Sequence, residues 1–426
     1  MGGLEEVVTG VKAFRRIALA NNENTINVPH ESYLRLFLRF LRFGLLAWGG
    51  PVAQIAMIRQ ELVDEEKWIP NARFNRVLAV YQALPGPEAH EMCVYFGMLS
   101  RGRLGGFLGG LGFMLPGFLL MFALSWFYLK YGLNSPLFAA FFFGCQAAVG
   151  ALILRAVHRI GGHALIDRSL WGIAIVSGIS AFLGAHFLII LILAGTAYVL
   201  LKRNYYIPAL ALGILLVAGS GFYSINILNL GMVSKSIAQT ITSSESPSLF
   251  TLFYSGLRSG LLTFGGAYTV IPYLQHDAVE VGRWMTNKQF LDGLALSGIL
   301  PAPLIIFATF VGYIGGGALG ALALTIGIFA PAFSFTLVGH KYLEKVVENK
   351  ALHVFNDGVT AGVVGLIAAT TIGLLKAGIT DIYAIGIFLW SIFLVYRWKS
   401  KYAVVGVVVA AGAISLLFNA LELLGK

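Results

Sequence analysis

The stretch Arg42-Phe-Gly-Leu-Leu-Ala-Trp-Gly-Gly50 recurs in the second half of the chain as Arg258-Ser-Gly-Leu-Leu-Thr-Phe-Gly-Gly266. The match continues without a gap to Pro85-Gly-Pro87 and Pro301-Ala-Pro303, and one offset of 216 residues separates every pair. Because chance does not hold a register over about 45 residues, the chain is a duplicated unit. Repeats whose apolar segments are broken by glycine and proline are typical of transporters with a site between the two halves.

Composition indicates an all-α polytopic membrane protein. Of the 426 residues, 58% are hydrophobic and 12% are charged, the mean hydropathy is +0.79, and apolar runs of about twenty residues recur. The net charge of +10 does not indicate nucleic acid, because the basic residues stand singly or in short groups between apolar runs, where they orient a membrane protein. Cys93 and Cys145 lie inside apolar segments, so no disulfide framework is expected.

The apolar runs predict about 13 transmembrane segments. They are 35–58, 74–99, 105–129, 137–158, 169–183, 186–201, 207–223, 249–275, 289–314, 317–339, 354–376, 381–396 and 402–421. The predicted domains are a cytoplasmic N-terminal segment 1–32 without the features of a cleaved signal, a first repeat 33–223, a linker 224–248 and a second repeat 249–426.

Positive charges favour this count and give an orientation. With the N-terminus in the cytoplasm, most lysines and arginines fall in cytoplasmic loops, among them Arg155, Arg159 and Lys401. The C-terminus is then external. Seven predicted spans precede the second repeat, and an odd number turns it upside down, so the two repeats should have inverted topology.

Both repeated motifs interrupt apolar segments and would leave backbone groups unpaired, which lipid cannot satisfy. New half-helices starting at 88 and 304 would direct free N–H groups toward an anion. The alternative is that the glycines serve close helix packing and the prolines only kink a helix. The residues predicted to bind substrate at these breaks are Gly49, Gly50, Pro85, Gly86, Pro87, Glu88, Gly265, Gly266, Pro301, Ala302 and Pro303.

Arg42 and Arg258 occupy equivalent positions, seven residues before the first glycine of each Gly-Gly pair. An arginine inside an apolar segment is expensive and indicates function, and its planar guanidinium can bind an oxyanion through two parallel hydrogen bonds. We therefore predict that both arginines bind substrate. The alternative, that the side chain reaches the membrane interface, is stronger for Arg42, which follows two other arginines.

Three carboxylates are candidates for proton coupling. Glu88 and Glu91 follow the first Pro-Gly-Pro, and Asp292 lies near the start of a later segment. Removal from water favours the protonated form of a carboxylate, so such a group can load and release a proton. The alternative for the two glutamates is capping of a helix N-terminus. Glu61 and Asp277, which are equivalent across the repeat, are interpreted as loop or cap residues.

The sequence contains no HExxH, GxSxG or Walker-type motif and no His/Cys cluster with metal-ligand spacing. We therefore expect no enzyme activity, no cofactor and no metal site. Without a nucleotide-binding domain, a transporter of this type is expected to be secondary, driven by an ion gradient or by exchange.

Phe40-Leu-Arg-Phe-Gly44, Gly49-Gly-Pro51, Leu84-Pro-Gly-Pro87 and the run from Gly105 to Pro116 resemble the chromate ion transporter family in its long form of two fused domains. The resemblance covers nearly the whole chain. It implies export of chromate across the cell's inner (plasma) membrane, with sulfate as an isosteric competitor and dependence on the proton-motive force. Ala302 and Ala267 depart from the first copy's motifs, which suggests that the N-terminal half supplies more of the site.

Other functions stay open from the sequence alone. An anion channel, or a transporter for another tetrahedral oxyanion such as sulfate, would use the same site. A membrane-embedded enzyme acting on a lipid head group is disfavoured by the missing catalytic motifs. The expected partners are chromate or sulfate, protons or a counter-anion, and the lipid bilayer, without nucleic acid. Assembly as a homodimer is left open.

Overall fold

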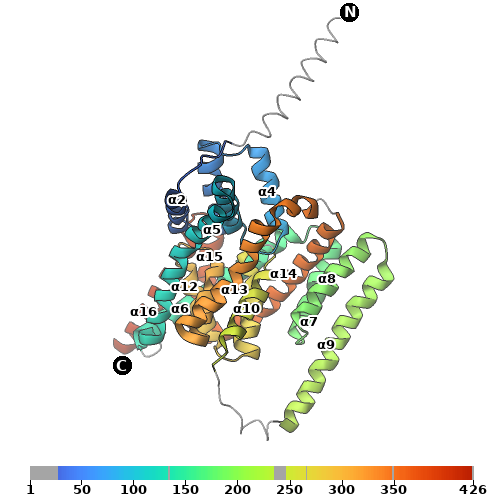
Figure 1. Cartoon of the computed structure of the whole chain (residues 1–426). Helices are drawn as coiled ribbons and strands as arrows, with labels where there is room; N and C mark the ends of the chain where they lie inside the picture. Colours follow the sequence, from blue (N-terminus) through green and yellow to red (C-terminus); the bar gives the residue numbers. More distant parts are fainter. Residues whose placement is uncertain (1–26, 133–134, 235–245, 265, 348–349, 425–426) are drawn as a thin grey trace, which may run out of the picture.

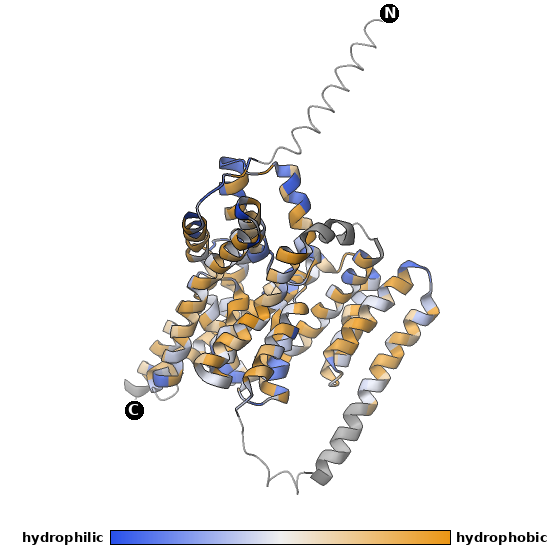
Figure 2. Cartoon of the chain, viewed as in Figure 1, coloured by the Kyte–Doolittle hydropathy of each residue, from blue (hydrophilic) through white to orange (hydrophobic). Residues whose placement is uncertain are grey.

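The structure is a computed structural model that describes residues 27–132, 135–234, 246–264, 266–347 and 350–424, and every regular element in these ranges is helical (Figure 1). Within them, five helical stretches are long and apolar enough to cross a membrane: Glu88–Gly132, Pro136–Ala164, Leu304–Gly339, Leu352–Gly378 and Ala403–Leu421. Shorter apolar helices accompany them. Apolar residues cover the bundle and polar residues gather at its ends and turns, as an integral membrane protein requires (Figure 2).

The helices repeat in the same order in the two halves. The first half contains α2 (Tyr33–Leu45), α3 (Gly50–Arg59), η1 (Gln60–Glu65), α4 (Asn71–Ala83), α5 (Glu88–Phe127), η2 (Tyr128–Gly132), α6 (Pro136–Ala164), α7 (Arg168–Phe182) and α8 (Phe187–Lys202). The second contains α10 (Leu249–Leu261), η4 (Ala267–Val270), α11 (Ile271–Gln275), η5 (His276–Val281), α12 (Asn287–Gly298), η6 (Leu304–Ile306), α13 (Phe307–Val347), α14 (Lys350–Gly378), α15 (Ile382–Arg397) and α16 (Ala403–Leu424).

Helix α9 (Tyr206–Ser234) stands between the two sets and packs against α8 (Figure 1). It extends beyond residue 223, where the sequence predicted a linker to begin. The N-terminal segment before residue 27 and the centre of the predicted linker, residues 235–245, lie outside the described residues.

The first segment of each repeat is a helical hairpin. Arg39 on α2 contacts Glu66 at 2.6 Å and Glu61 at 3.1 Å, although 27 residues of straight helix would be about 40 Å long. In the second repeat, Asp277 accepts a hydrogen bond from Ser255 at 2.6 Å, again across the turn. The prediction that 35–58 and 249–275 are single interrupted spans is therefore wrong. The helix is interrupted at the glycines as predicted, but the chain turns back at each interruption instead of continuing across the membrane.

The second segment of each repeat also folds back. Across the Pro85-Gly-Pro87 turn, Arg73 donates to the Tyr95 hydroxyl at 3.0 Å, and across the second turn the rings of Phe290 and Phe307 lie 4.8 Å apart. Segments 74–99 and 289–314 are thus hairpins as well, and the count of 13 spans is not confirmed. Because proline removes a backbone donor and excludes the helical conformation from its predecessor, two prolines in three residues end one helix and allow the next to start in a new direction.

The long helices α5 and α13 each contain one sharp reversal. At Arg101 the backbone has φ −142° and ψ 29°, and at Gly102 φ 63° and ψ −157°; Gly316 and Gly317 repeat this geometry. A Cβ at Gly109 would lie 2.7 Å from the Cys93 carbonyl oxygen, whereas sixteen residues of continuous helix span about 24 Å. Each helix is therefore a short arm that closes a hairpin and a long arm that can cross the membrane.

Glycines bring the first helix of each repeat into backbone contact with the long arm. A Cβ at Gly44 of α2 would collide with the Phe113 carbonyl oxygen of α5, and one at Gly260 of α10 would collide with the Ile328 carbonyl oxygen of α13. Small residues allow this approach, which is a usual means of helix association in membranes. Gly44 and Gly260 therefore serve close helix packing.

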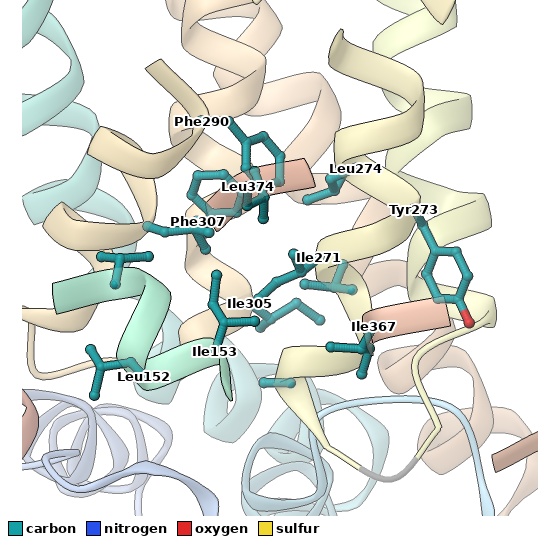
Figure 3. Close-up of a cluster of buried hydrophobic side chains, with 14 of the residues drawn as sticks. Leu152, Ile153, Ile271, Tyr273, Leu274, Phe290, Ile305, Phe307, Ile367 and Leu374 are labelled. Carbon is teal, nitrogen blue, oxygen red and sulfur yellow. The ribbon is translucent and has the colours of Figure 1, made fainter. Parts of the chain in front are cut away.

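Helices α6 and α14 hold the halves together. They run antiparallel, because Gly378 of α14 contacts Gln146 of α6 while Val364 contacts Gly161. The α7–α8 hairpin of the first half packs on α14, and the α15–α16 hairpin of the second half packs on α6. At the crossing, Ile153 and Ile367 join a buried apolar cluster with residues of α11, α12 and the start of α13 (Figure 3). The core of each half is thus covered by helices of the other half.

Replacing Gly44 by alanine should destabilise the protein by about 1–3 kcal/mol, because the added methyl group overpacks the α2–α5 contact. The midpoint of thermal unfolding in detergent measures this. Gly386→Ala is the matched control, because a Cβ at that helical position meets open space. Equal midpoints for the two variants would show that α2 does not pack as described.

Candidate functional site

The turns of the hairpins meet between the two halves. The Gly86 amide, in the Pro-Gly-Pro turn of the first half, donates to the Thr263 carbonyl in the α10–η4 turn at 2.9 Å. In the corresponding place, the turn at Trp48–Pro51 faces the turn that contains Ala302, and both line one cavity. The interrupted backbone of each half therefore lies against that of the other half.

This cavity has a volume of about 140 Å³, several times the ~30 Å³ that one molecule occupies in liquid water. Its walls come from both halves: the α2–α3 turn, α6, the α12–η6 turn and the connection between α15 and α16. The residues that line it are Trp48, Gly49, Gly50, Pro51, Leu152, Arg155, Ala156, Arg159, Tyr268, Ser297, Gly298, Leu300, Ala302, Leu304, Ser400, Lys401, Ala403, Val404 and Val405.

Three cations stand at this cavity. Arg155 and Arg159 are one turn apart on the same face of α6, and Lys401 follows α15. Within the described part of the chain, none of the three forms an ion pair with a carboxylate. The Arg159 guanidinium lies 5.9 Å from the centre of the Tyr268 ring. The described residues that line the cavity thus include three cations and no carboxylate.

The backbone adds to this field. Gly49 has φ 89° and Gly50 has φ 78°, left-handed conformations that glycine adopts at no steric cost. They place the N-terminus of α3 at the cavity, with Pro51 in its first turn. The N–H groups at a helix start favour a negative charge. Two guanidinium groups, an ammonium and a helix start converge on a space that suits a small anion.

Arg42 and Arg258 do not line the cavity. Arg42, 55% exposed, forms an ion pair with Glu61, and Arg258, 23% exposed, forms one with Asp277, which is 6% exposed. Each carboxylate lies on the π-helical turn of the same hairpin, η1 or η5. The interpretation of Glu61 and Asp277 as loop or cap residues is therefore wrong, because both pair with the repeated arginines and compensate their charge.

Only some of the other predicted site residues line the cavity. Gly49, Gly50 and Ala302 line the cavity, with Pro301 and Pro303 on either side of Ala302. The predicted half-helix start at 88 is confirmed, whereas the start at 304 is a short 3₁₀ turn before α13. Pro85, Gly86 and Pro87 form the turn that binds Thr263. Gly266 has φ 115° and leads into η4, and Gly265 lies outside the described residues.

Glu88 and Glu91 lie on the first turn of α5 and are buried. Among the described residues, Glu88 Oε2 and both carboxylate oxygens of Glu91 have no hydrogen-bond partner. Glu88 interacts electrostatically with Arg159. Between them His90 packs its ring against Phe329 and Phe333, at 5.0 and 4.6 Å. The acidic turn therefore borders the cationic cavity.

Asp292 on α12 is buried and joins the halves. It accepts a hydrogen bond from the Tyr128 hydroxyl at 2.7 Å and one from the Gln146 amide at 2.8 Å. Both donors are neutral and belong to the first half, whereas Asp292 belongs to the second. A change in the protonation of this carboxylate therefore alters the strength of hydrogen bonds that connect the halves.

Sequence reasoning missed the three cations of the cavity. Arg155, Arg159 and Lys401 are located near the ends of apolar segments, so hydropathy assigned them to cytoplasmic loops. The available signal was the spacing of the two arginines, four residues apart on one helical face.

A bundle of apolar helices with broken hairpins around a charged cavity is typical of a membrane transport protein. The profile of the chromate transporter family matches residues 34–201 and again 250–416. The chain therefore belongs to the chromate transporter family, and each half carries one copy of its domain.

Relatives support this assignment. The chain is 55% identical to the chromate transport protein of Pseudomonas aeruginosa over 388 residues, which cover 90% of this chain and 92% of the relative. It is 29% identical to a probable chromate transport protein of Synechococcus elongatus, over 87% and 91% of the two chains. An uncharacterized transporter of Bacillus subtilis is 32% identical over 37% of this chain and 79% of its own length. No solved structure matches the chain.

The ion pair of Arg258 with Asp277 generates a stability prediction. Asp277→Asn or Arg258→Gln alone leaves one charge without its partner, which costs at most about 3–5 kcal/mol for a buried pair. The double variant Arg258→Gln/Asp277→Asn removes both charges and should recover part of that loss. Thermal unfolding midpoints of the parent, both single variants and the double variant measure the coupling. If the two losses simply add, the arginine does not depend on this carboxylate.

Proposed function

We propose that this protein is a secondary transporter that exports chromate from the cytoplasm and binds it in the cavity between the two halves. The observation that carries the proposal is the cluster of Arg155, Arg159 and Lys401, unpaired with carboxylates, around the interrupted helix at Gly49–Gly50. Chromate is a tetrahedral dianion, and the planar guanidinium groups match the spacing of its oxygen atoms. Sulfate has the same charge and shape, so the site should recognise it as well.

In this mechanism the cations of the cavity bind the substrate, a role that the sequence had assigned to Arg42 and Arg258. The latter two are compensated by carboxylates of their own hairpins, so their role is to hold each hairpin closed. The cavity arginines keep their charge available for substrate. Ser400 and Tyr268 also line the cavity, and their hydroxyl groups can donate hydrogen bonds to oxyanion oxygens, whereas the Ser297 hydroxyl donates to the Leu304 carbonyl.

An inverted repeat is supported by helix directions. The equivalent helices α6 and α14 run antiparallel at their contact, and α9, which has no counterpart, adds one crossing before the second half begins. In Figure 1, α2 lies near the top of the bundle and α16 runs to the opposite end. This arrangement fits a cytoplasmic N-terminus and an external C-terminus, and it gives the two halves opposite orientations around the site.

For energy coupling we propose protons, with a counter-anion as the alternative. Asp292 is the strongest carrier, because its two hydrogen bonds come from Tyr128 and Gln146 of the other half. On protonation one oxygen of the Asp292 carboxyl group becomes a hydroxyl donor and accepts hydrogen bonds more weakly. The contact of α12 with η2 and α6 then changes with the proton. Glu88 and Glu91 are secondary candidates beside the cavity.

Arg155→Gln or Arg159→Gln should lower chromate transport by about 10- to 100-fold, since a hydrogen bond to a charged group contributes about 1.5–3 kcal/mol. Uptake of radiolabelled chromate into proteoliposomes measures this. Arg168→Gln is the matched control, because Arg168 is exposed and does not line the cavity. Arg42→Gln should leave the half-saturation concentration unchanged. Normal transport by both cavity variants would refute the site.

Asp292→Asn should abolish the acceleration of chromate transport by an imposed pH gradient while chromate binding persists, because the amide cannot take up a proton. Transport at several gradients, compared with the parent, is the measurement. Asp381→Asn serves as the control, because Asp381 only caps α15 and asparagine caps equally well. A variant that responds to the gradient as the parent does would exclude Asp292 as the carrier.

A further inference from the structure

One wall of the cationic cavity is a contact between the two halves. The α2–α3 turn of the first half and the connection between α15 and α16 of the second half both line the cavity. The rings of Trp48 and Tyr402 meet there edge to face, with 6.0 Å between their centres. Beside them, a Cβ at Gly49 would lie 3.1 Å from the Cβ of Lys401. The two segments therefore touch at the rim of the cavity.

This rim is the part of the cavity that reaches the surface. The exposed residues among those that line the cavity are Gly49, Arg159, Ser400 and Lys401. Three of these four belong to the two segments that touch. Tyr402, which stands between them, is 48% exposed. The cavity therefore opens to the surface beside the aromatic contact.

The two sides of the contact are fixed to different helices. The buried side chain of Gln54 donates to the Ala47 carbonyl at 2.9 Å and so holds the turn to α3. Helices α2 and α3 pack on α5 of their own half, whereas α16 packs on α6. A displacement of the first hairpin relative to α6 can therefore separate Trp48 from Tyr402 while both segments stay folded.

The second repeat shows which of the two equivalent turns is held less firmly. Phe264, 216 residues after Trp48, is its counterpart. The turn that contains Phe264 is bound to the first half by the hydrogen bond from the Gly86 amide to the Thr263 carbonyl, and Phe264 packs against the central apolar cluster. In the described part of the chain, no backbone hydrogen bond joins the α2–α3 turn to the second half. The α2–α3 turn is therefore the more easily displaced.

We propose that Trp48 and Tyr402 form a gate at the opening of the oxyanion cavity. The proposal rests on the proposed function, because it takes this cavity as the oxyanion site. Both are positioning residues: their contact restricts the opening around a bound anion, and their separation lets the anion pass. Arg397, Lys399 and Lys401 lie at or next to this contact and mark the proposed cytoplasmic face, so an exported anion enters here.

The accessibility of a cysteine inside the cavity tests the gate. In a background with Cys93 and Cys145 replaced by alanine, Ala156→Cys places a thiol among the buried residues that line the cavity. A small, membrane-impermeant methanethiosulfonate is applied from each face in turn, and the reaction rate is measured. Trp48→Ala/Tyr402→Ala should raise this rate by about two- to tenfold, the factor that corresponds to the ~0.5–1.5 kcal/mol of one aromatic pair. An unchanged rate would overturn the proposal.

Two controls separate the gate from a general loosening of the structure. Tyr383→Ala/Phe418→Ala removes another aromatic contact between α15 and α16, with ring centres 5.6 Å apart and Tyr383 also 48% exposed. Neither of these residues lines the cavity. Trp48→Phe keeps an aromatic ring at the gate. Both controls should leave the labelling rate of Ala156→Cys as in the parent, and an equal increase in the Tyr383→Ala/Phe418→Ala variant would contradict the gate.

Joining the two sides of the contact tests its role in transport. Trp48→Cys/Tyr402→Cys, in the same background, is bridged with a short bifunctional methanethiosulfonate. Uptake of radiolabelled molybdate, a tetrahedral dianion that oxidises thiols far less readily than chromate, is then measured in proteoliposomes. Bridging should abolish most of the uptake, and a reductant should restore it. Tyr383→Cys/Phe418→Cys, bridged in the same way, should keep its uptake.

The two experiments distinguish failure of the gate from failure of the proposed function. Uptake that persists in the bridged Trp48→Cys/Tyr402→Cys protein would overturn the gate and leave the oxyanion site standing. If the parent carries neither chromate nor molybdate, the proposed function is wrong. The labelling rate of Ala156→Cys still decides the gate in that case, because it needs no oxyanion.

Discussion

Backbone that leaves helical geometry inside a membrane must find its hydrogen-bond partners in protein, because lipid offers none. In this chain each half supplies partners for the other: the amide of Gly86 in the first half binds the carbonyl of Thr263 in the second. In addition, α7–α8 of the first half packs on α14 of the second, and α15–α16 of the second half packs on α6 of the first. The halves therefore cannot separate without exposing broken helices, and any cavity they enclose is bordered by backbone from both.

Much of this arrangement is readable from residue types. The duplication, the break at Gly49–Gly50 and the break at Pro85–Pro87 follow from glycine and proline, whose backbone preferences act locally. The reversal of the chain at these breaks does not follow, because hydropathy records that a segment is apolar but not whether it crosses or returns. The pairing of Arg42 with Glu61 was missed for the same reason, since the two residues approach each other only after the chain has turned back.

The candidate site was predicted in part. Its glycines and Ala302 carried the signal of interrupted helices and do line the cavity. Arg155 and Arg159 carried a conflicting signal, because basic residues at the end of an apolar run usually mark a cytoplasmic loop. Whether they line the cavity depends on which face of α6 meets the second half, and the α6–α14 and α6–α15 contacts decide this. Tertiary packing, not local sequence, selects the cations that line the cavity.

The arginine pairs of the first hairpins have an electrical consequence. Moving one elementary charge through the membrane potential requires about 2.3 kcal/mol per 100 mV. Arg42 with Glu61 and Arg258 with Asp277 each travel as a neutral unit if a hairpin shifts its depth. The membrane potential therefore exerts little net force on either ion pair, whatever depth its hairpin takes.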